Sequence, residues 1–197
     1  MTARTLEEGV AFVEERLGVQ LEPGGRHEAM GTRNRLLSLG EELYLEVIAV
    51  DPEAASPSHK RWFNLDRFSG PPRLSNWVAR CEHLDEALRR APAGSGEPMS
   101  LERGELRWEM AVPDDGLLPF DGCFPALIAW AGNAHPARNL PDRGCRLHSL
   151  ELRHPRAEEL RLALRDLIDD RRIEVTSGSA PGLRARIVTP TGECVLD

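Results

Sequence analysis

The sequence predicts an α+β fold in which a strand, a helix and three further strands form a unit that occurs three times. The first observation is a helical period of apolar residues, seen over residues 6–17 and again over residues 155–168. The second is the series of short strand-like runs that follows each predicted helix. The third is that the same order returns after segments rich in Pro, Gly and Ser. These segments divide the chain into units at residues 1–52, 73–132 and 145–197.

The first unit begins almost directly with its helix, predicted over residues 6–17. Thr5 is a suitable N-cap, and Gly18 is a suitable residue to end the helix. Only residues 1–4 precede the cap, so the opening strand of this unit is missing. Its remaining strands are expected at residues 19–22, 34–39 and 43–50.

The second unit is predicted to open with a strand at residues 74–81, followed by a short helix at residues 83–90. The turn Arg103-Gly104 joins the next two strands into a hairpin. The three strands after the helix are expected at residues 99–102, 105–112 and 124–130.

The third unit is predicted to open with a strand at residues 146–153. Pro155 then begins a helix, because proline is well tolerated in the first helical turn. The apolar face of this helix consists of Leu160, Leu164, Leu167 and Ile168. The unit closes with strands at residues 173–176, 183–188 and 193–196.

Charge and hydropathy exclude two classes of partner. The chain has 25 Lys and Arg against 32 Asp and Glu, and its net charge of -7 repels nucleic-acid phosphate. Every apolar run is interrupted well before membrane-spanning length, and the start does not resemble a cationic leader. We therefore expect a cytoplasmic protein that binds neither nucleic acid nor membranes. Its four cysteines are widely separated and are expected to be reduced thiols.

Several short phrases of the sequence are distinctive. They are EERLGV at residues 14–19, GGRH at 24–27, MGTRN at 30–34, YLEVIA at 44–49, RWF at 61–63, WVAR at 77–80, LIAW at 127–130, HP at 135–136 and LELRHP at 150–155. In these phrases the chain resembles the bacterial glyoxalase-like branch of the vicinal oxygen chelate superfamily, of the glyoxalase/bleomycin resistance/dioxygenase type. The resemblance covers about the whole chain. It implies βαβββ units that curl into an open barrel.

The resemblance implies two classes of function. In the first, residues on facing strands bind a divalent metal (Zn, Fe, Mn, Ni or Co) that chelates two adjacent oxygens of a small oxygenated metabolite. The chain is then a metal-dependent lyase, isomerase or dioxygenase. In the second, a metal-free pocket sequesters or senses an apolar small molecule, as relatives of the bleomycin-resistance type do. The resemblance favours the enzyme. The metal content of the purified protein would distinguish the two classes.

Glu46 is the strongest candidate for a functional residue, because it is an acid within an otherwise apolar strand. An unpaired carboxylate in such a place is costly. The resemblance implies that Glu46 is a metal ligand or a proton-transfer residue on the last strand of its unit. The alternative is an acid that faces solvent on a half-exposed strand.

Six further residues are candidates for binding the substrate. Gly24 and Gly25 let the backbone approach a ligand closely, and His27 lies beside them. Each kind of residue in this group also has a purely structural alternative: a histidine in a loop, an asparagine that caps a turn, or a tryptophan in the core. The six residues are His27, Asn34, Trp62, Asn76, Trp130 and His135.

His148 and Glu193 form a second possible metal-binding pair, on the first and last strands of the third unit. Imidazole and carboxylate are suitable ligands for Zn, Fe or Mn. Asn76 takes the corresponding place in the second unit, and its amide is a poor ligand for a transition metal. This difference argues against a complete metal site.

The missing opening strand has two explanations. Translation from a start upstream of Met1 would supply about eight to ten alternating residues, as one strand requires, with a His among them. The other explanation is a genuine truncation. An incomplete first unit leaves a sheet edge that needs cover, which predicts a homodimer unless the chain covers this edge itself.

Overall fold

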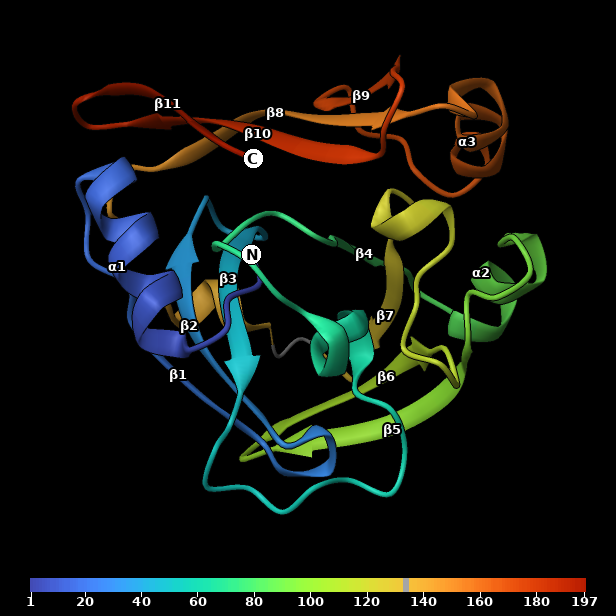
Figure 1. The fold of residues 1–197 in the computed structure, drawn as a ribbon, viewed down its shortest axis with the longest axis horizontal. Helices are drawn as coiled ribbons and strands as arrows, with labels where there is room; N and C mark the ends of the chain where they lie inside the picture. The colour runs from blue at the N-terminus through green and yellow to red at the C-terminus, as the bar shows by residue number, and fades with distance from the viewer. Residues whose placement is uncertain (133–134) are drawn as a thin grey trace.

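The computed structural model describes residues 1–132 and 135–197 and confirms the α+β class. Its described strands form three separate sheets, and each sheet has at least one α-helix in contact with it (Figure 1). In the view of Figure 1, the sheet made by the C-terminal part of the chain lies as a layer across the other two. None of the described helices has the length and apolar character needed to cross a membrane.

The first helix, α1 (Leu6–Leu17), has the predicted bounds and caps. The Thr5 hydroxyl accepts a hydrogen bond from the Glu8 backbone amide at 3.2 Å. Gly18 ends the helix with φ of 67°, a left-handed conformation that favours glycine. The buried face of α1 packs on β3 (Tyr44–Val50).

The first sheet has the order β1-β2-β3, with β1 (Glu22–His27) beside β2 (Thr32–Ser38). The strand predicted at residues 19–22 is therefore wrong, because the chain becomes extended only at Glu22. The ladder between β1 and β2 shifts register between Pro23 and Arg26. Gly24 and Gly25 form this bulge, where the absence of a side chain lets the two strands approach.

A short stretch at the N-terminus takes part of the place of the missing opening strand. Thr2 pairs with Ile48 of β3 in parallel and with Arg73 in antiparallel orientation. The Thr2 backbone amide donates to the Arg73 carbonyl at 2.9 Å, and the Ala3 amide donates to the Ile48 carbonyl at 3.2 Å. The chain thus covers this end of the β3 edge itself.

The second sheet has the order β4-β7-β6-β5. β4 runs parallel to β7, and the other neighbours are antiparallel. The strand predicted at residues 74–81 is reduced to its last part, because the ladder with β7 begins at Val78, while the Leu74 backbone amide donates to the Asp197 carbonyl at 3.2 Å. The elements are β4 (Val78–Arg80), α2 (Leu84–Arg90), β5 (Glu97–Arg103), β6 (Leu106–Val112) and β7 (Ala126–Trp130).

The third sheet has the order β11-β10-β8-β9, so its first strand lies inside the sheet, whereas β4 lies at an edge. The same succession of strand, helix and three strands therefore pairs differently here. The predicted helix begins later than Pro155 because residues 155–156 form a turn. The elements are β8 (Arg146–His154), α3 (Ala157–Arg165), β9 (Ile173–Ser177), β10 (Gly182–Thr189) and β11 (Gly192–Leu196).

Short 3-10 helices that the sequence did not predict interrupt the connections. One of them, η2, contains two consecutive residues with positive φ, Phe63 and Asn64. It places Trp62 and Phe63 in the interior. The four are η1 (Glu28–Met30), η2 (Trp62–Arg67), η3 (Phe120–Gly122) and η4 (Pro136–Asn139).

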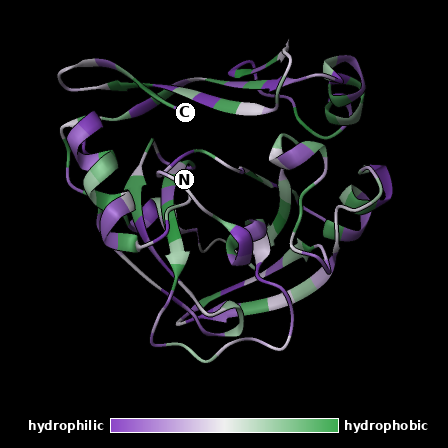
Figure 2. Ribbon diagram, viewed as in Figure 1, coloured by the Kyte–Doolittle hydropathy of each residue, from purple (hydrophilic) through white to green (hydrophobic). Residues whose placement is uncertain are grey.

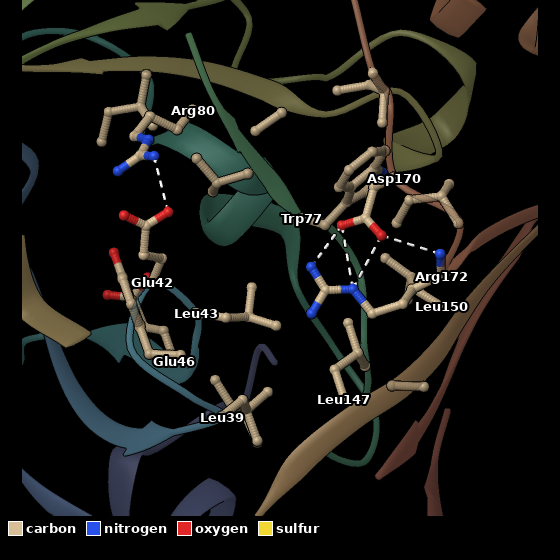
Figure 3. Close-up of a pocket in the computed structure, with 18 of the residues that line it drawn as sticks. Leu39, Glu42, Leu43, Glu46, Trp77, Arg80, Leu147, Leu150, Asp170 and Arg172 are labelled. Atoms are coloured by element: carbon tan, nitrogen blue, oxygen red, sulfur yellow. Dashed lines mark hydrogen bonds and ion pairs between the residues drawn. The ribbon is translucent and has the colours of Figure 1, made fainter. Parts of the chain in front are cut away.

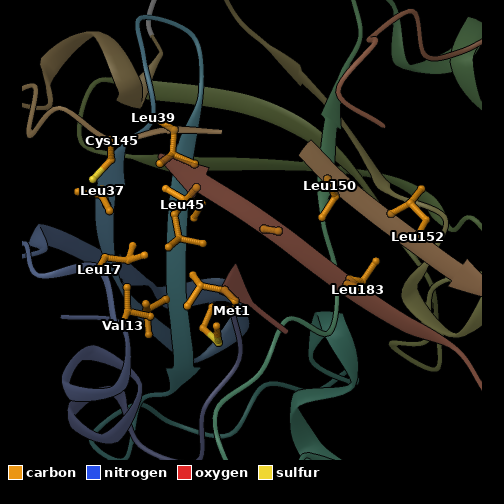
Figure 4. Close-up of a cluster of buried hydrophobic side chains, with 14 of the residues drawn as sticks. Met1, Val13, Leu17, Leu37, Leu39, Leu45, Cys145, Leu150, Leu152 and Leu183 are labelled. Atoms are coloured by element: carbon orange, nitrogen blue, oxygen red, sulfur yellow. The ribbon is translucent and has the colours of Figure 1, made fainter. Parts of the chain in front are cut away.

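Two clusters of buried side chains position the site. The larger cluster joins α1, the outer face of the first sheet and the third sheet, as the labelled side chains in Figure 4 show. The second cluster fills the space between the first two sheets and contains Trp62, Trp108, Met110 and Ile128. Hydrophobic and hydrophilic residues alternate along the strands in Figure 2, as expected for sheets with differently buried faces. Glu46 and Asn34 lie on strands of the first sheet beside this second cluster.

Candidate functional site

Two neighbouring cavities share the inner face of β3. The larger measures about 640 Å³ and reaches from β3 past residues 76–80 to the third sheet (Figure 3). The smaller measures about 40 Å³ and lies between the first two sheets. The walls common to both cavities are Tyr44, Glu46, Val78, Ile128 and Trp130. Glu46 therefore lies where the two spaces meet.

The Glu46 carboxylate is held by Asn34. The Asn34 side-chain amide donates to Oε1 of Glu46, while Oε2 has no hydrogen-bond partner among the residues that the structure describes. Asn34 is only 4% exposed, whereas Glu46 is half-buried. One oxygen of the carboxylate is thus fixed, and the other is available to a molecule in the cavity.

Asn34 is itself fixed by the Gly24-Gly25 bulge. Its Oδ1 accepts a hydrogen bond from the Gly25 backbone amide at 2.7 Å. A Cβ on Gly24 would lie 2.1 Å from this oxygen, and a Cβ on Gly25 would lie 2.7 Å from Cδ of Arg103. The two glycines are therefore required for the positions of Asn34 and Arg103, and they do not make a flexible ligand-binding loop.

His27, at the end of β1, is 7% exposed and sits between Thr32 and Arg103. Its Nδ1 lies 3.1 Å from Oγ1 of Thr32, and its Nε2 lies 3.1 Å from Nη1 of Arg103. Since a guanidinium only donates, we assign Nε2 as the acceptor and the proton to Nδ1. Burial lowers the pKa of His27 to about 4, the nearby Arg103 charge also lowers it, and Glu46 acts in the opposite direction. His27 is neutral at pH 7.

Aromatic side chains enclose this polar group. The ring of His27 lies edge-on to Trp62 at 5.1 Å and to Trp108 at 6.2 Å. Trp130 packs on Trp108 at 5.2 Å. Trp62 is 4% exposed, and its indole Nε1 has no hydrogen-bond partner among the described residues. An unpaired buried donor is costly, so this nitrogen is a natural place for a ligand acceptor.

Asn76 and His135 line the larger cavity instead. The Asn76 Oδ1 accepts from Ser75 Oγ at 3.0 Å, which occupies it in a structural contact. The His135 Nδ1 accepts from the Ala137 amide and caps η4, while burial lowers its pKa. Its ring lies 5.6 Å from those of Tyr44 and Trp130. Burial raises the pKa of Tyr44, so its phenol is protonated at pH 7.

The structure does not bring His148 or Glu193 to Glu46. Both are exposed on the third sheet, and β10 separates their strands. His148 lies where the ladder between β8 and β10 shifts register, and Glu193 pairs with Arg186 at 3.3 Å. Among the described lining residues of the two cavities, neither is present. The two side chains thus belong to a different surface from the Glu46 site.

Three residues of the site were missed by the sequence analysis: Tyr44, Arg103 and Trp108. Arg103 precedes the glycine of a hairpin turn, where an arginine is ordinarily a solvated residue. The alternation of β6 indicates that Trp108 faces inward, but not what it faces. Tyr44 lies two residues before Glu46 on the same strand, so strand periodicity places both on one face. Only the packing of one sheet against the other shows that Arg103 and Trp108 line the same cavity as Glu46.

The side chains around Glu46 do not fit a transition-metal site. In the described part of the chain, no group of three or more His, Cys, Asp or Glu side chains is arranged to hold an ion. Both ring nitrogens of His27 are engaged, and the neighbouring cation Arg103 would repel a metal ion. The set that surrounds Glu46 is instead suited to hydrogen bonding with an organic ligand.

Comparison with known families assigns the fold. Residues 1–168 match the model of the glyoxalase-like domain. The chain belongs to the glyoxalase-like domain family. This is a domain of the vicinal oxygen chelate type, as the sequence resemblance predicted. The match includes every lining residue of the small cavity and ends before β9.

A solved structure is similar to this glyoxalase-like chain. It is the crystal structure of a hypothetical protein from Staphylococcus aureus, with a TM-score of 0.51 and 11% sequence identity. The alignment covers 83% of this chain and 79% of that one. At this identity the likeness concerns the fold alone. No curated protein matches the chain.

Proposed function

We propose that this glyoxalase-like domain binds a small organic molecule beside Glu46, with the carboxylate as its hydrogen-bond acceptor and without a metal ion. The observation that carries the proposal is the state of Glu46. Its Oε1 is fixed by Asn34, and its Oε2 has no partner in the described part of the chain. A preorganised acceptor at the wall of a cavity is typical of a site that orients a ligand donor.

The two cavities support a ligand with two different ends. The larger one, at about 640 Å³, is the size of common small-molecule sites. Apolar walls such as Leu150, Ile168 and Ile128 suit a hydrophobic body. Charged walls of this cavity away from Glu46 are paired with one another, Arg80 with Glu42 and Arg172 with Asp170 (Figure 3). The Glu46 end, in contrast, offers an acceptor oxygen that no described residue occupies. This arrangement favours the binding alternative of the sequence analysis over the metal-dependent lyase, isomerase or dioxygenase.

Metal content is the first test. Protein purified without chelator is analysed by elemental mass spectrometry as wild type, Glu46→Gln and His148→Gln. The proposal expects less than about 0.1 equivalent of Zn, Fe, Mn, Ni or Co in each protein, since useful affinity needs a complete ligand set. Near-stoichiometric metal that disappears in Glu46→Gln would overturn the metal-free site and restore the enzyme prediction.

Ligand binding is the second test. Small aromatic fragments that carry an amine, a hydroxyl or an amide are titrated against the fluorescence of the tryptophans that line the site. We expect those with a donor group to lose about tenfold in affinity in Glu46→Gln, because one hydrogen bond to a charged group is lost. Glu193→Gln is the matched control, an exposed carboxylate on the third sheet. Equal losses in the two variants would contradict the assignment of Glu46.

A further inference from the structure

Arg103 reaches the Glu46 site from the other sheet. It is the last residue of β5, and its Nη1 lies 3.1 Å from His27 Nε2 and 3.4 Å from Asn34 Oδ1. The Gly25 bulge leaves the space that its Cδ occupies. Arg103 and Glu46 thus lie on opposite sides of one amide, because Asn34 accepts from the former and donates to the latter.

The Arg103 guanidinium donates its hydrogen bonds to neutral groups. Both hydrogen-bond partners, the His27 imidazole and the Asn34 amide, are uncharged at pH 7. Among the described ion pairs, none includes Arg103. Arg107 on the same hairpin, in contrast, pairs with Glu102 at 3.0 Å. In a chain with more acids than bases, a half-buried arginine held without a carboxylate is a cation available to an anion.

A second donor points to the same ligand chemistry. The buried Trp62 Nε1 lacks a partner among the described residues, and Trp62 lines the small cavity together with Arg103 and Glu46. That cavity measures about 40 Å³, which exceeds the volume share of one water molecule but is far too small for a whole metabolite. It has room for one small polar group. The body of the ligand would extend into the larger cavity past Trp130.

We propose that Arg103 binds an acidic group of the ligand, a carboxylate or a phosphate, in the small cavity, and is the specificity-determining residue of this site. The inference rests on the proposed function and names the class of ligand: a small organic acid whose acidic group meets Arg103 and Trp62. A hydrogen-bond donor elsewhere on the same molecule meets Glu46. Arginine is suited to this role because its planar fork matches an acidic group in two places.

The test compares probes that share a phenyl ring and differ in the charge and hydrogen-bonding capacity of the polar group. Phenylacetate, phenyl phosphate and the neutral phenylacetamide are titrated at pH 7 against tryptophan fluorescence. We expect at least one acid to bind the wild type about tenfold more tightly than the amide, since hydrogen bonds to charged groups are the stronger ones. The acid that shows the larger preference identifies the anion. Equal affinity for acids and amide overturns the inference and leaves the proposed function standing.

Variants identify the residue responsible. Arg103→Gln is expected to remove the preference for the acid, and Arg107→Gln, on the exposed face of the same hairpin, to keep it. Arg103→Lys retains the charge without the fork and is expected to keep part of the preference, which separates recognition from misfolding. Trp62→Phe should lower the affinity for the acid about threefold to tenfold, because the indole donor is lost. A preference that persists in Arg103→Gln overturns the inference.

Failure of the proposed function has a different signature. If neither the three probes nor the donor-bearing fragments of the earlier titration bind wild type at about 10 mM, a concentration that detects even very weak complexes, the small-molecule site is refuted and the role of Arg103 with it. Thermal melts of all variants are recorded in parallel. A melt of Arg103→Gln that coincides with wild type shows that its loss of preference is not a folding defect.

Discussion

Nη1 of Arg103 lies 3.1 Å from Nε2 of His27, although 76 residues separate the two side chains. This contact joins the hairpin of the second sheet to the bulged edge of the first. It requires an unprotonated Nε2, because two donors cannot share a hydrogen bond. The protonation state of one buried histidine is therefore coupled to the packing of two sheets.

His27 should make stability depend on pH. Burial lowers its folded pKa to about 4, below the 6.5 of an unfolded chain. Between these values the unfolded chain binds more protons, so stability falls as the pH falls from about 6.5 to about 4. The loss due to His27 is at most about 3.5 kcal/mol, from about 1.4 kcal/mol per pKa unit. Denaturant unfolding at several pH values measures it.

The control for this effect is an exposed histidine. In His27→Gln, the slope of unfolding free energy between pH 4 and pH 6.5 should be smaller than in wild type, because the titrating group has gone. His148→Gln removes an exposed histidine and should leave the slope unchanged. If His27→Gln and wild type have parallel stability profiles, His27 does not titrate as described.

Asn34→Ala should destabilise the chain by about 1–3 kcal/mol, because it leaves the Gly25 amide and a partly buried carboxylate without their partner. Chemical denaturation measures the change. Asn139→Ala, at an exposed position in η4, is the control and should change stability by less than about 0.5 kcal/mol. An Asn34→Ala protein as stable as wild type would show that the amide bridge does not stabilise the fold.

Gly24→Ala should lower the free energy of unfolding by about 1–3 kcal/mol through overpacking, since the added Cβ would meet both the side chain and the backbone of Asn34. The neighbouring atoms include backbone, which cannot move aside cheaply. Gly182→Ala is matched to it, because its Cβ would meet only the end of the flexible Arg153 side chain, at 3.1 Å. Equal melting temperatures for the two variants would refute a close approach at Gly24.

The homodimer stays a prediction. Thr2 covers one end of the β3 edge, but β4 is the last strand of its sheet in the described part of the chain, and Val78 on it is 37% exposed. Open edges pair with other chains unless they are protected. Light scattering at micromolar concentration should give twice the chain mass of 21.9 kDa. A mass equal to one chain over the whole dilution series would exclude the dimer.

The sequence by itself determined the elements whose signals are local. The helix over residues 6–17, with its Thr5 cap and Gly18 end, follows from a hydrophobic period and two capping residues. Glu46 could be singled out because an acid in an apolar strand is visible without any partner. Family membership followed from phrases along the chain and was confirmed over residues 1–168.

Only the tertiary structure decided which distant residues meet. Strand periodicity cannot distinguish an edge position from an interior one, so β8 and β4 could not be told apart until their sheets were assembled. A pair of glycines is compatible with a loop or a bulge, and the approach of β2 decides between them. Arg103 meets His27 because two sheets share one interior, and a contact across 76 residues leaves no pattern in a single sequence.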